Sequence, residues 1–395
     1  MYNIEPQKYI TDQPWIKPLH QRLRELNQYK YEGYNIAMYL YEYPDNSTFR
    51  YRVYNMCQAL ELSLEWKGVY FYKSELEVIK GYLDKINILI LARFRWDFNI
   101  QKIIDQAREK GIKTVFEVDD MIYSTEYLPI IANTLSVSMG NEADYDYWFA
   151  YISRMNETAK KCDAMLTTNS FLADKMCKDL GVKAYVISNF TNRIQESISN
   201  AYYMQKQEQC SSEKFVIGYF SGTPSHINDF LVVAPELKKL LEKYQDIVLR
   251  IVGFMTLPDY LHDLEESGRI ERLALVNYLD LQKEIAKVDV NIAPLVNNDF
   301  SNCKSELKFF EASIVGTVTC ATPSYTFRNA ITDERTGYLC ERGKWYDRLE
   351  ELYENRKQNN EEMVSAAREY CKKTYSYCNK TADIEKVFDE MLIVG

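Results

Sequence analysis

The sequence predicts an α/β protein built from two Rossmann-like domains that face each other across a cleft. The chain has 395 residues, more than a single hydrophobic core usually organises, so two domains are expected. Short apolar runs of strand length alternate with helical segments, an order typical of a parallel sheet with helices on both faces. The alternation stops once, in the polar stretch 192–214, and then starts again.

The first series of elements follows a polar and aromatic segment that contains one amphipathic stretch. We assign residues 1–33 to an N-terminal extension and residues 34–205 to the first domain. Apolar residues recur at helical spacing over 49–61, directly after a turn that ends in capping residues. The predicted strands of this domain are the apolar runs 34–42, 68–72, 86–92, 113–118, 163–169 and 183–189.

The second series repeats the alternation after the polar stretch, which we interpret as a linker region. We assign residues 206–365 to a second Rossmann-like domain and residues 366–395 to closing helices. Each predicted strand is followed by a helical segment, so this sheet is also expected to be parallel. The strands are expected at 215–220, 247–253, 273–279, 288–295 and 317–321.

Composition excludes several classes of function. A net charge of -9 argues against nucleic-acid binding, which requires a basic face. Nine scattered cysteines without CxxC spacing and only three histidines provide no zinc pattern, so no metal site and no cofactor are predicted. Reduced thiols, the lack of a signal peptide and the lack of a membrane-spanning run indicate a cytoplasmic protein. Association with a membrane surface and assembly into a homo-oligomer stay open.

The stretch 304–331 places charged side chains before an apolar run, a glycine and a short β-branched strand. On a helix over 304–315, Lys304, Lys308 and Glu311 fall within one narrow sector, apart from the apolar stripe. Free N–H groups at the helix start, with Lys304, would favour a phosphate, and a carboxylate two turns later could accept sugar hydroxyls. The alternative is a Lys308–Glu311 ion pair on a solvated helix.

A second candidate for donor binding is the sequence SGTPSH, which follows the first strand of the second domain. Gly222 would allow a close approach of the backbone, and Ser221 and Thr223 offer hydroxyl and N–H groups to a phosphate. His226 is a candidate for a phosphate or sugar contact. A plain glycine turn with an N-cap, and a surface histidine, are the alternatives.

Candidate acceptor-side groups occur in the first domain. Glu117, Asp119 and Asp120 end an apolar strand, where carboxylates could bind sugar hydroxyls, act as a base or cap the next helix. We favour a catalytic role for Asp119 and Asp120. Four arginines near the strand ends could hold an anionic acceptor such as a lipid-linked diphosphate, although each could be a solvated charge: Arg50, Arg52, Arg93 and Arg95.

The segment from about 215 to 342 resembles the donor-binding region of retaining glycosyltransferases of family 4. The resemblance is carried by KSELKFFEASIVGTVTCATPSYTFRNAI, with VDVNIAPL before it, TGYLC after it and IGYFSGTPSHINDF at 217–230. STFRYRVYNMCQALE and FEVDDMIY of the first domain look like a bacterial polysaccharide-building branch of that family. The resemblance implies the GT-B fold, with the final helix crossing back to the first domain.

The resemblance also implies roles for individual residues. Glu311, followed by Ala312, looks like the glutamate that binds the nucleotide ribose in the family. A second family glutamate, eight positions earlier, is replaced here by Cys303, and SGTPSH stands where the family has an arginine and a lysine. Lys304 and His226 are expected to supply these contacts. Ser305 belongs to the same Lys-Ser-Glu form and is assigned to the donor site with Lys308.

The function implied is metal-independent transfer of a hexose or deoxyhexose, with retention, from a nucleotide-diphospho-sugar to a hydroxyl of a saccharide or lipid-linked saccharide. Lys304 would stabilise the leaving diphosphate, and the synthesis of bacterial surface glycans is the expected setting. Two alternatives stay open: a sugar-nucleotide epimerase of the same fold, and a catalytically silent homologue that binds a partner. Donor hydrolysis would distinguish an enzyme from a silent homologue, and product analysis would distinguish a transferase from an epimerase.

Overall fold

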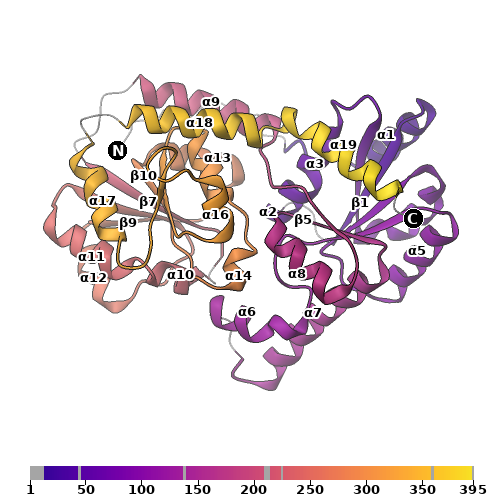
Figure 1. Cartoon of the computed structure of the whole chain (residues 1–395), viewed down its shortest axis with the longest axis horizontal. Helices are drawn as coiled ribbons and strands as arrows, with labels where there is room; N and C mark the ends of the chain where they lie inside the picture. The colour runs from indigo at the N-terminus through magenta and orange to yellow at the C-terminus, as the bar shows by residue number, and fades with distance from the viewer. Residues whose placement is uncertain are drawn as a thin grey trace.

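The computed structural model contains two six-stranded parallel sheets, one in each half of the chain (Figure 1). It describes residues 13–42, 46–136, 139–208, 214–223, 226–356 and 360–393. The first sheet has the strand order β2-β1-β3-β4-β5-β6, and the second has the order β12-β11-β10-β7-β8-β9. The two parallel sheets with covering helices confirm the predicted α/β architecture.

The inner strands are short and almost wholly buried, as expected for parallel sheets covered on both faces, whereas the edge strands β6 and β9 are partly exposed. The first sheet consists of β1 (Asn35–Tyr41), β2 (Trp66–Tyr72), β3 (Ile88–Ala92), β4 (Lys113–Glu117), β5 (Ala164–Thr167) and β6 (Ala184–Val186). The second consists of β7 (Phe215–Ser221), β8 (Ile247–Gly253), β9 (Ile270–Leu273), β10 (Val290–Ala293), β11 (Val318–Ala321) and β12 (Tyr338–Leu339).

Helices cover both sheets and connect their strands. Those of the first half are α1 (Leu19–Tyr31), α2 (Ser47–Phe49), α3 (Asn55–Leu60), α4 (Leu76–Ile79), α5 (Phe98–Glu109), α6 (Leu128–Thr134), α7 (Glu142–Lys161), α8 (Ser170–Leu180) and α9 (Arg193–Gln207). Those of the second half are α10 (Ile227–Leu231), α11 (Ala234–Lys243), α12 (His262–Glu266), α13 (Tyr278–Ala286), α14 (Asp299–Asn302), α15 (Leu307–Ser313), α16 (Tyr325–Ala330), α17 (Trp345–Glu354), α18 (Glu361–Tyr375) and α19 (Tyr377–Ile393).

Several predicted elements differ from the structure. The stretch that we interpreted as a linker contains α9, which buries Ile198 and Tyr202 and packs against α13. The strand predicted at 273–279 is wrong: β9 ends at Leu273 and α13 begins at Tyr278, because Asn277 caps that helix. The part of the N-terminal extension that is described includes α1, which packs on β1 and β2. Residues 1–12 lie outside the described part.

The two closing helices connect the halves of the molecule (Figure 1). In the view of Figure 1, α18 runs along the top of the second half, and α19 continues over the first half. The helix α18 packs against α15, whereas α19 packs against α3. The rings of Trp66 and Phe388 lie 5.1 Å apart, and Trp66 Nε1 donates to Asp389 at 2.9 Å. The predicted return of the last helix to the first half is therefore confirmed.

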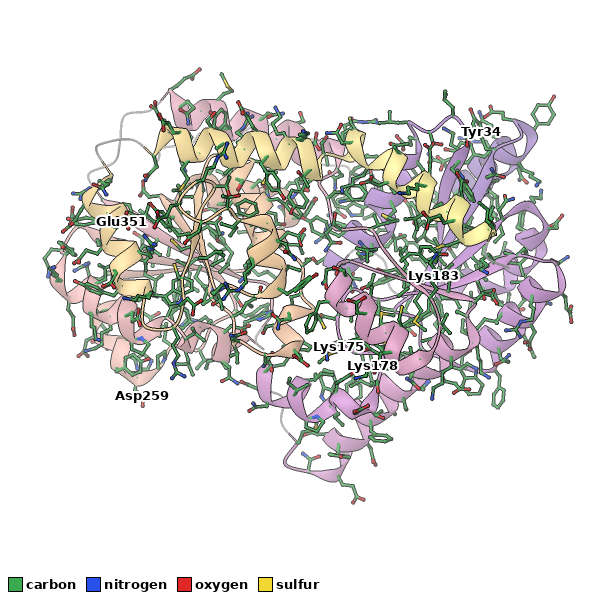
Figure 2. The ribbon with its side chains drawn as sticks, in the orientation of Figure 1. Tyr34, Lys175, Lys178, Lys183, Asp259 and Glu351 are labelled. Atoms are coloured by element: carbon green, nitrogen blue, oxygen red, sulfur yellow. The ribbon has the colours of Figure 1, made fainter. Side chains whose placement is uncertain are left out.

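The two halves also contact each other between the sheets. One hydrophobic cluster contains buried side chains of both halves, including Tyr51, Tyr278 and Phe310. Lys175 of α8, labelled near the junction in Figure 2, pairs with Asp299 of α14 at 2.7 Å. The interface is thus both apolar and polar. The division into segments at residues 33, 205 and 365 stays a prediction.

Candidate functional site between the sheets

The predicted site residues lie on loops that leave each sheet where its strand order reverses. In the second sheet this point lies between β7 and β10, and in the first it lies between β1 and β3. Ligands of open α/β sheets bind in the crevice outside the carboxyl ends of the strands at such a point. The segments that follow these four strands carry the predicted donor-side residues and the four predicted acceptor-side arginines, and Asp119 and Asp120 follow the neighbouring strand β4. The fold therefore places both groups where a ligand is expected.

Lys308 and Glu311 lie on α15, one turn apart. Glu311 is 8 % exposed, and its Oε1 accepts a hydrogen bond from the Tyr51 hydroxyl of the first half at 2.5 Å. Burial raises the pKa of Glu311 to about 7, although Tyr51, Lys308 and Arg50 oppose the shift. Glu311 is therefore held by the other half of the molecule instead of facing solvent.

The Lys308 ammonium lies over the ring of Tyr219, near the end of β7, at 4.8 Å from the centroid. Burial lowers its pKa to about 8, against the opposing effects of Asp229 and Glu311. The solvated ion pair considered from the sequence does not describe this helix. Both charged groups instead titrate near neutral pH at the interface between the sheets.

Lys304 precedes the helix on which the sequence placed it. The chain forms a separate short helix, α14, because the Asn298 side chain caps it by accepting from Ser301 N at 2.9 Å. α15 then begins at Leu307, so the predicted single helix over 304–315 is wrong. The Lys304 ammonium lies 3.1 Å from Asp120 Oδ1, in the other half of the molecule. Two residues that we predicted to be catalytic thus meet across the interface.

Asp119 and Asp120 form one charged group with Arg93. The Arg93 guanidinium donates to Asp119 Oδ1 at 2.5 Å and to Asp120 Oδ2 at 3.2 Å. Burial would raise the pKa of Asp120, but Lys304 and Arg93 outweigh it and hold that pKa below its usual value. Arg93 has a φ of 47°, which is unusual for a residue with a side chain and is concentrated at functional sites.

His226 is positioned by Asp229, a residue that the sequence reasoning missed. His226 Nδ1 lies 2.9 Å from Asp229 Oδ2, and the other oxygen of this buried carboxylate accepts from Val296 N at 2.8 Å. Burial lowers the pKa of His226, although Asp229 opposes the shift, so the ring is neutral at neutral pH. A neutral ring that donates from Nδ1 to Asp229 leaves Nε2 as an acceptor, which suits a sugar hydroxyl better than a phosphate oxygen.

The remaining donor-side candidates are less directly involved. The Ser221 hydroxyl donates to Thr223 O at 3.0 Å, and this contact shapes the loop after β7. A side chain at Gly222 would meet open space, and the φ of this residue is not in the left-handed region, so the structure does not require glycine there. Ser305 Oγ accepts from Asn189 Nδ2 of the first half at 3.0 Å. Ser305 therefore joins the polar interface rather than standing free beside a ligand.

The predicted acceptor-side arginines have different environments. Arg52 is fully buried and donates from Nε to Glu117 Oε1 at 2.6 Å, an arrangement that favours a structural role. Arg95 pairs with Glu42 at 2.7 Å at the rim of the first sheet. The Arg50 guanidinium lies 4.6 Å from the ring centroid of Tyr278. Of the four arginines, the structure brings only Arg93 into the group with Asp120.

Cys303, which stands in place of the family glutamate, is buried at the interface. Its carbonyl oxygen accepts from Asn169 Nδ2 at 2.8 Å, and its Sγ lies 3.7 Å from the sulfur of Met121. Burial raises the pKa of its thiol, so the side chain stays neutral and packs as a small apolar group. Within the described ranges, no group of three or more histidine, cysteine, aspartate or glutamate side chains is arranged to hold a metal ion.

The Tyr51–Glu311 contact continues into a buried polar network that the sequence did not reveal. Gln195 Nε2 donates to the Tyr51 hydroxyl at 3.0 Å, and the Tyr278 hydroxyl donates to Gln195 Oε1 at 2.5 Å. Asn192 Nδ2 donates to the Tyr278 hydroxyl at 3.0 Å. The network joins elements from both halves directly behind Glu311, so it fixes how close the halves lie.

The second half of the molecule contributes Lys304, Lys308 and Glu311 to the site, and the first half contributes Asp119 and Asp120. Lys304 faces Asp120 across the interface. Lys304 and Lys308 could stabilise an anion such as a diphosphate, and Glu311 could accept hydrogen bonds from vicinal hydroxyls. Asp119 and Asp120 could bind or deprotonate a hydroxyl from the opposite side. The geometry suits a substrate that presents an anionic group to one half and a hydroxyl to the other.

Comparisons with known proteins identify a family over part of the chain and a common fold over most of it. Residues 214–355 match the family described as Glycosyl transferases group 1. No curated protein matches the sequence. Among the described helices, none combines the length and the hydropathy that crossing a membrane requires.

Solved structures share the architecture over most of the chain. A glycosyltransferase from Rickettsia africae covers 91% of this chain and 99% of its own, with a TM-score of 0.61 and 13% identity. Sucrose-phosphate synthase from Thermosynechococcus elongatus covers 91% and 100%, with a TM-score of 0.61 and 10% identity. HepE from Anabaena, solved in complex with UDP-glucose, covers 90% and 99%, with a TM-score of 0.55 and 11% identity. At such low identity these likenesses show a common fold.

Proposed function

We propose that the chain, whose residues 214–355 match the family Glycosyl transferases group 1 and whose fold is GT-B-like, acts as a glycosyltransferase. It transfers a hexose or deoxyhexose from a nucleotide-diphospho-sugar to a hydroxyl of a saccharide or lipid-linked saccharide, and the configuration at the anomeric carbon is retained. The expected setting is the synthesis of a bacterial surface glycan or glycoconjugate.

The donor binds to the second half of the molecule. Glu311 accepts hydrogen bonds from the ribose hydroxyls, which replace the hydroxyl of Tyr51 as its partner. Lys304 and Lys308 hold the diphosphate, and His226, oriented by Asp229, accepts from a hydroxyl of the sugar. The UDP-glucose complex of HepE makes a UDP-sugar the first donor to test.

The acceptor approaches from the first half. Asp120, held by Arg93, binds the attacking hydroxyl, and Asp119 supports it through the same guanidinium. The hydroxyl oxygen forms a bond to the anomeric carbon while the bond from that carbon to the diphosphate breaks. The proton of the hydroxyl passes to the departing phosphate oxygen, as the family resemblance implies, and the negative charge remains on the nucleoside diphosphate.

One observation supports this proposal above the others: Lys304 and Asp120, from opposite halves of the molecule, lie 3.1 Å apart. A bound donor would replace Asp120 with the diphosphate as the partner of Lys304. The carboxylate that is released then lies next to the bond that breaks, where an acceptor hydroxyl is needed. Charge that develops on the diphosphate is met by an ammonium that is already positioned.

A screen of nucleotide-sugars tests the proposed function. Thermal shift with UDP-, GDP-, ADP-, CDP- and dTDP-linked hexoses identifies the donor, and release of the nucleoside diphosphate measures its turnover. We expect stabilisation by at least one donor, and Glu311→Gln should weaken the binding of that donor at least about tenfold, since bonds to a charged group contribute roughly 1.5–3 kcal/mol. If no nucleotide-sugar stabilises the protein, or if the Gln variant binds equally well, the proposal is wrong.

A further inference from the structure

Helix α7 presents an unusual number of aromatic side chains to solvent. Five of the seven residues from 145 to 151 are aromatic, and Tyr145, Tyr147 and Phe149 are 50%, 58% and 46% exposed. In Figure 1, α6 and α7 lie at the lower edge of the molecule, away from the closing helices. Trp148 and Tyr151 are partly buried against the core of the first half, whereas the three exposed rings gain little from packing. Exposed rings next to each other are typical of a surface that binds a ligand.

The rings form two separate groups on the helix. Tyr147 and Tyr151 are stacked with centroids 6.1 Å apart and an interplanar angle of 22°, and Trp148 meets both rings edge-on. Tyr145 and Phe149 form a second stacked pair, 6.3 Å apart at 16°. Residues four apart share a helix face, whereas residues two apart do not, so the two pairs lie on different faces.

The first group is continuous with the acceptor side of the site. The Arg95 guanidinium lies 5.3 Å from the centroid of the Tyr151 ring, and Arg154 of α7 donates to Trp96 O at 2.7 Å. The same short loop carries Arg93, which holds Asp119 and Asp120. Burial raises the pKa of Tyr151, while the neighbouring charges of Arg93 and Arg95 oppose the shift, so its ring lies close to both arginines.

The charges around the exposed rings narrow the choice of ligand. Residues 142–153 contain no lysine or arginine, and Glu142, Asp144 and Asp146 lie in the same turns as the exposed tyrosines. The two arginines beside the first group are paired with carboxylates, Arg95 with Glu42 and Arg154 with Asp97. An anionic lipid surface attracts basic helices and is repelled by this one. A neutral ligand with flat apolar faces and hydroxyl groups fits better, because rings offer area for stacking and carboxylates accept hydrogen bonds.

We propose that Tyr147, Trp148 and Tyr151 form an outer subsite that stacks against a sugar ring of the acceptor, beyond the residue that receives the new sugar. This inference rests on the proposed function, because it takes the acceptor to be a saccharide. The subsite extends the acceptor path from Asp120 past Arg93 and Arg95 and along α7. The enzyme would then favour an acceptor chain of several sugars over a single sugar.

Direct binding of oligosaccharides tests the subsite without requiring turnover. The probes are cellopentaose, maltopentaose and chitopentaose, each compared with its monosaccharide by ligand-observed NMR titration. We expect at least one pentasaccharide to bind more tightly than its monosaccharide, and Tyr147→Ala should raise the dissociation constant of that pentasaccharide about tenfold, as expected for the loss of one stacking ring. The monosaccharide should not distinguish Tyr147→Ala from the unmodified protein.

The matched control is Tyr145→Ala, which removes a tyrosine of similar exposure from another face of the same helix. It should leave both pentasaccharide binding and donor hydrolysis unchanged. The proposal is overturned if no pentasaccharide binds, if the two variants lose binding equally, or if Tyr147 instead governs flotation with phosphatidylglycerol vesicles or self-association in sedimentation. If oligosaccharides bind through Tyr147 but no nucleotide-sugar is cleaved, the proposed function fails while the subsite stands.

Discussion

Two charged side chains on one short helix, Lys308 and Glu311, titrate close to neutral pH. Burial lowers the pKa of Lys308 to about 8 and raises that of Glu311 to about 7. Both groups have the charge needed to bind a nucleotide-sugar only between these two values, because Glu311 must be ionised and Lys308 protonated. If these groups bind the donor as proposed, donor binding is expected to depend on pH.

We predict that the affinity for UDP-glucose passes through a maximum between about pH 7 and 8. Below pH 7, protonated Glu311 loses its capacity as a charged acceptor, and at pH 6 about a tenth of it remains ionised, so binding should weaken about tenfold. Above pH 8, Lys308 loses its proton and its attraction for the diphosphate. Calorimetric titration of UDP-glucose, whose diphosphate does not titrate in this range, measures the profile.

One variant tests whether Glu311 causes the loss of affinity below pH 7. Glu311→Gln should bind UDP-glucose weakly and without the change between pH 6 and 7, since its amide does not titrate. An unmodified protein that binds UDP-glucose equally well at pH 6 and pH 7.5 would show that Glu311 does not act as an ionised acceptor.

At the residue scale, the sequence predicted charged site candidates that the structure brings close together, and it missed the groups that position them. Lys304, Lys308 and Glu311 follow one another in a short stretch, so their spacing alone suggested a common ligand. The partner of Glu311, Tyr51, lies 260 positions away, and the two sides meet only because the halves of the molecule pack together. Asp229 was missed for a similar reason, since its contact with Val296 spans 67 positions of the chain.

Among the elements, the helical segment after β1 depends on a buried ion pair. Arg50–Tyr54 forms a single π-helical turn between α2 and α3, and Arg52 in this turn donates to Glu117 at the end of β4. Both side chains are fully buried. Burial raises the pKa of Glu117 to about 7, while Arg52 favours its ionised form. Glu117 thus depends on Arg52 for its charge.

We predict that Arg52→Met destabilises the protein by about 3–5 kcal/mol at pH 8, because it leaves a buried carboxylate without its partner. The loss should be smaller at pH 6, where Glu117 can take up a proton. Urea denaturation at the two pH values measures both effects. Arg108→Met, at a site where 57% of the side chain is exposed, is the control and should change the stability by no more than about 0.5 kcal/mol. Equal losses from both substitutions would show that the pair does not support this element.

Sequence patterns predicted most of these elements because buried strands and amphipathic helices have strong local signals. The π-helical turn left no such signal, since its apolar residues still recur at helical spacing over 49–61. The wrong strand at 273–279 has a related cause: its apolar side chains Leu275, Val276 and Leu279 lie in a connecting loop and in the first turn of a helix. Local hydrophobicity did not distinguish these states.

Across the whole molecule, the closing helices tie the two halves together. Phe388 of α19 is fully buried and packs on Trp66 of the first sheet, whereas α18 packs on α15 beside the site.

We predict that Phe388→Ala lowers the free energy of unfolding of the first half of the molecule by about 3–5 kcal/mol, the usual cost of removing a buried ring. Urea denaturation measures this change. Ile393→Ala, on the same helix at a side chain that is 81% exposed, should have an effect of at most about 0.5 kcal/mol. Equal effects would indicate that α19 does not stabilise the first half.

The overall architecture could be predicted from the sequence because each half repeats a strand–helix alternation. The return of the last helix was implied only by resemblance to a family. How closely the two sheets approach could not be predicted, since it is set by contacts such as those of Tyr51 and Lys304 that join residues far apart in the chain. The residues of the candidate site could thus be predicted in part, but not the contacts that bring its two sides together.

In the proposed reaction, Lys304 exchanges Asp120 for the donor diphosphate. Lys304→Ala should lower kcat about a hundredfold and change the donor KM far less, because charge grows on the diphosphate in the transition state. Asp120 keeps Arg93 as a partner in this variant, so the fold should persist. Lys304→Arg should restore part of the rate, and Lys308→Ala should be milder. Steady-state release of the nucleoside diphosphate by these variants is the most direct measurement. A change in KM alone, or equal effects at both lysines, would show that Lys304 does not stabilise the departing diphosphate.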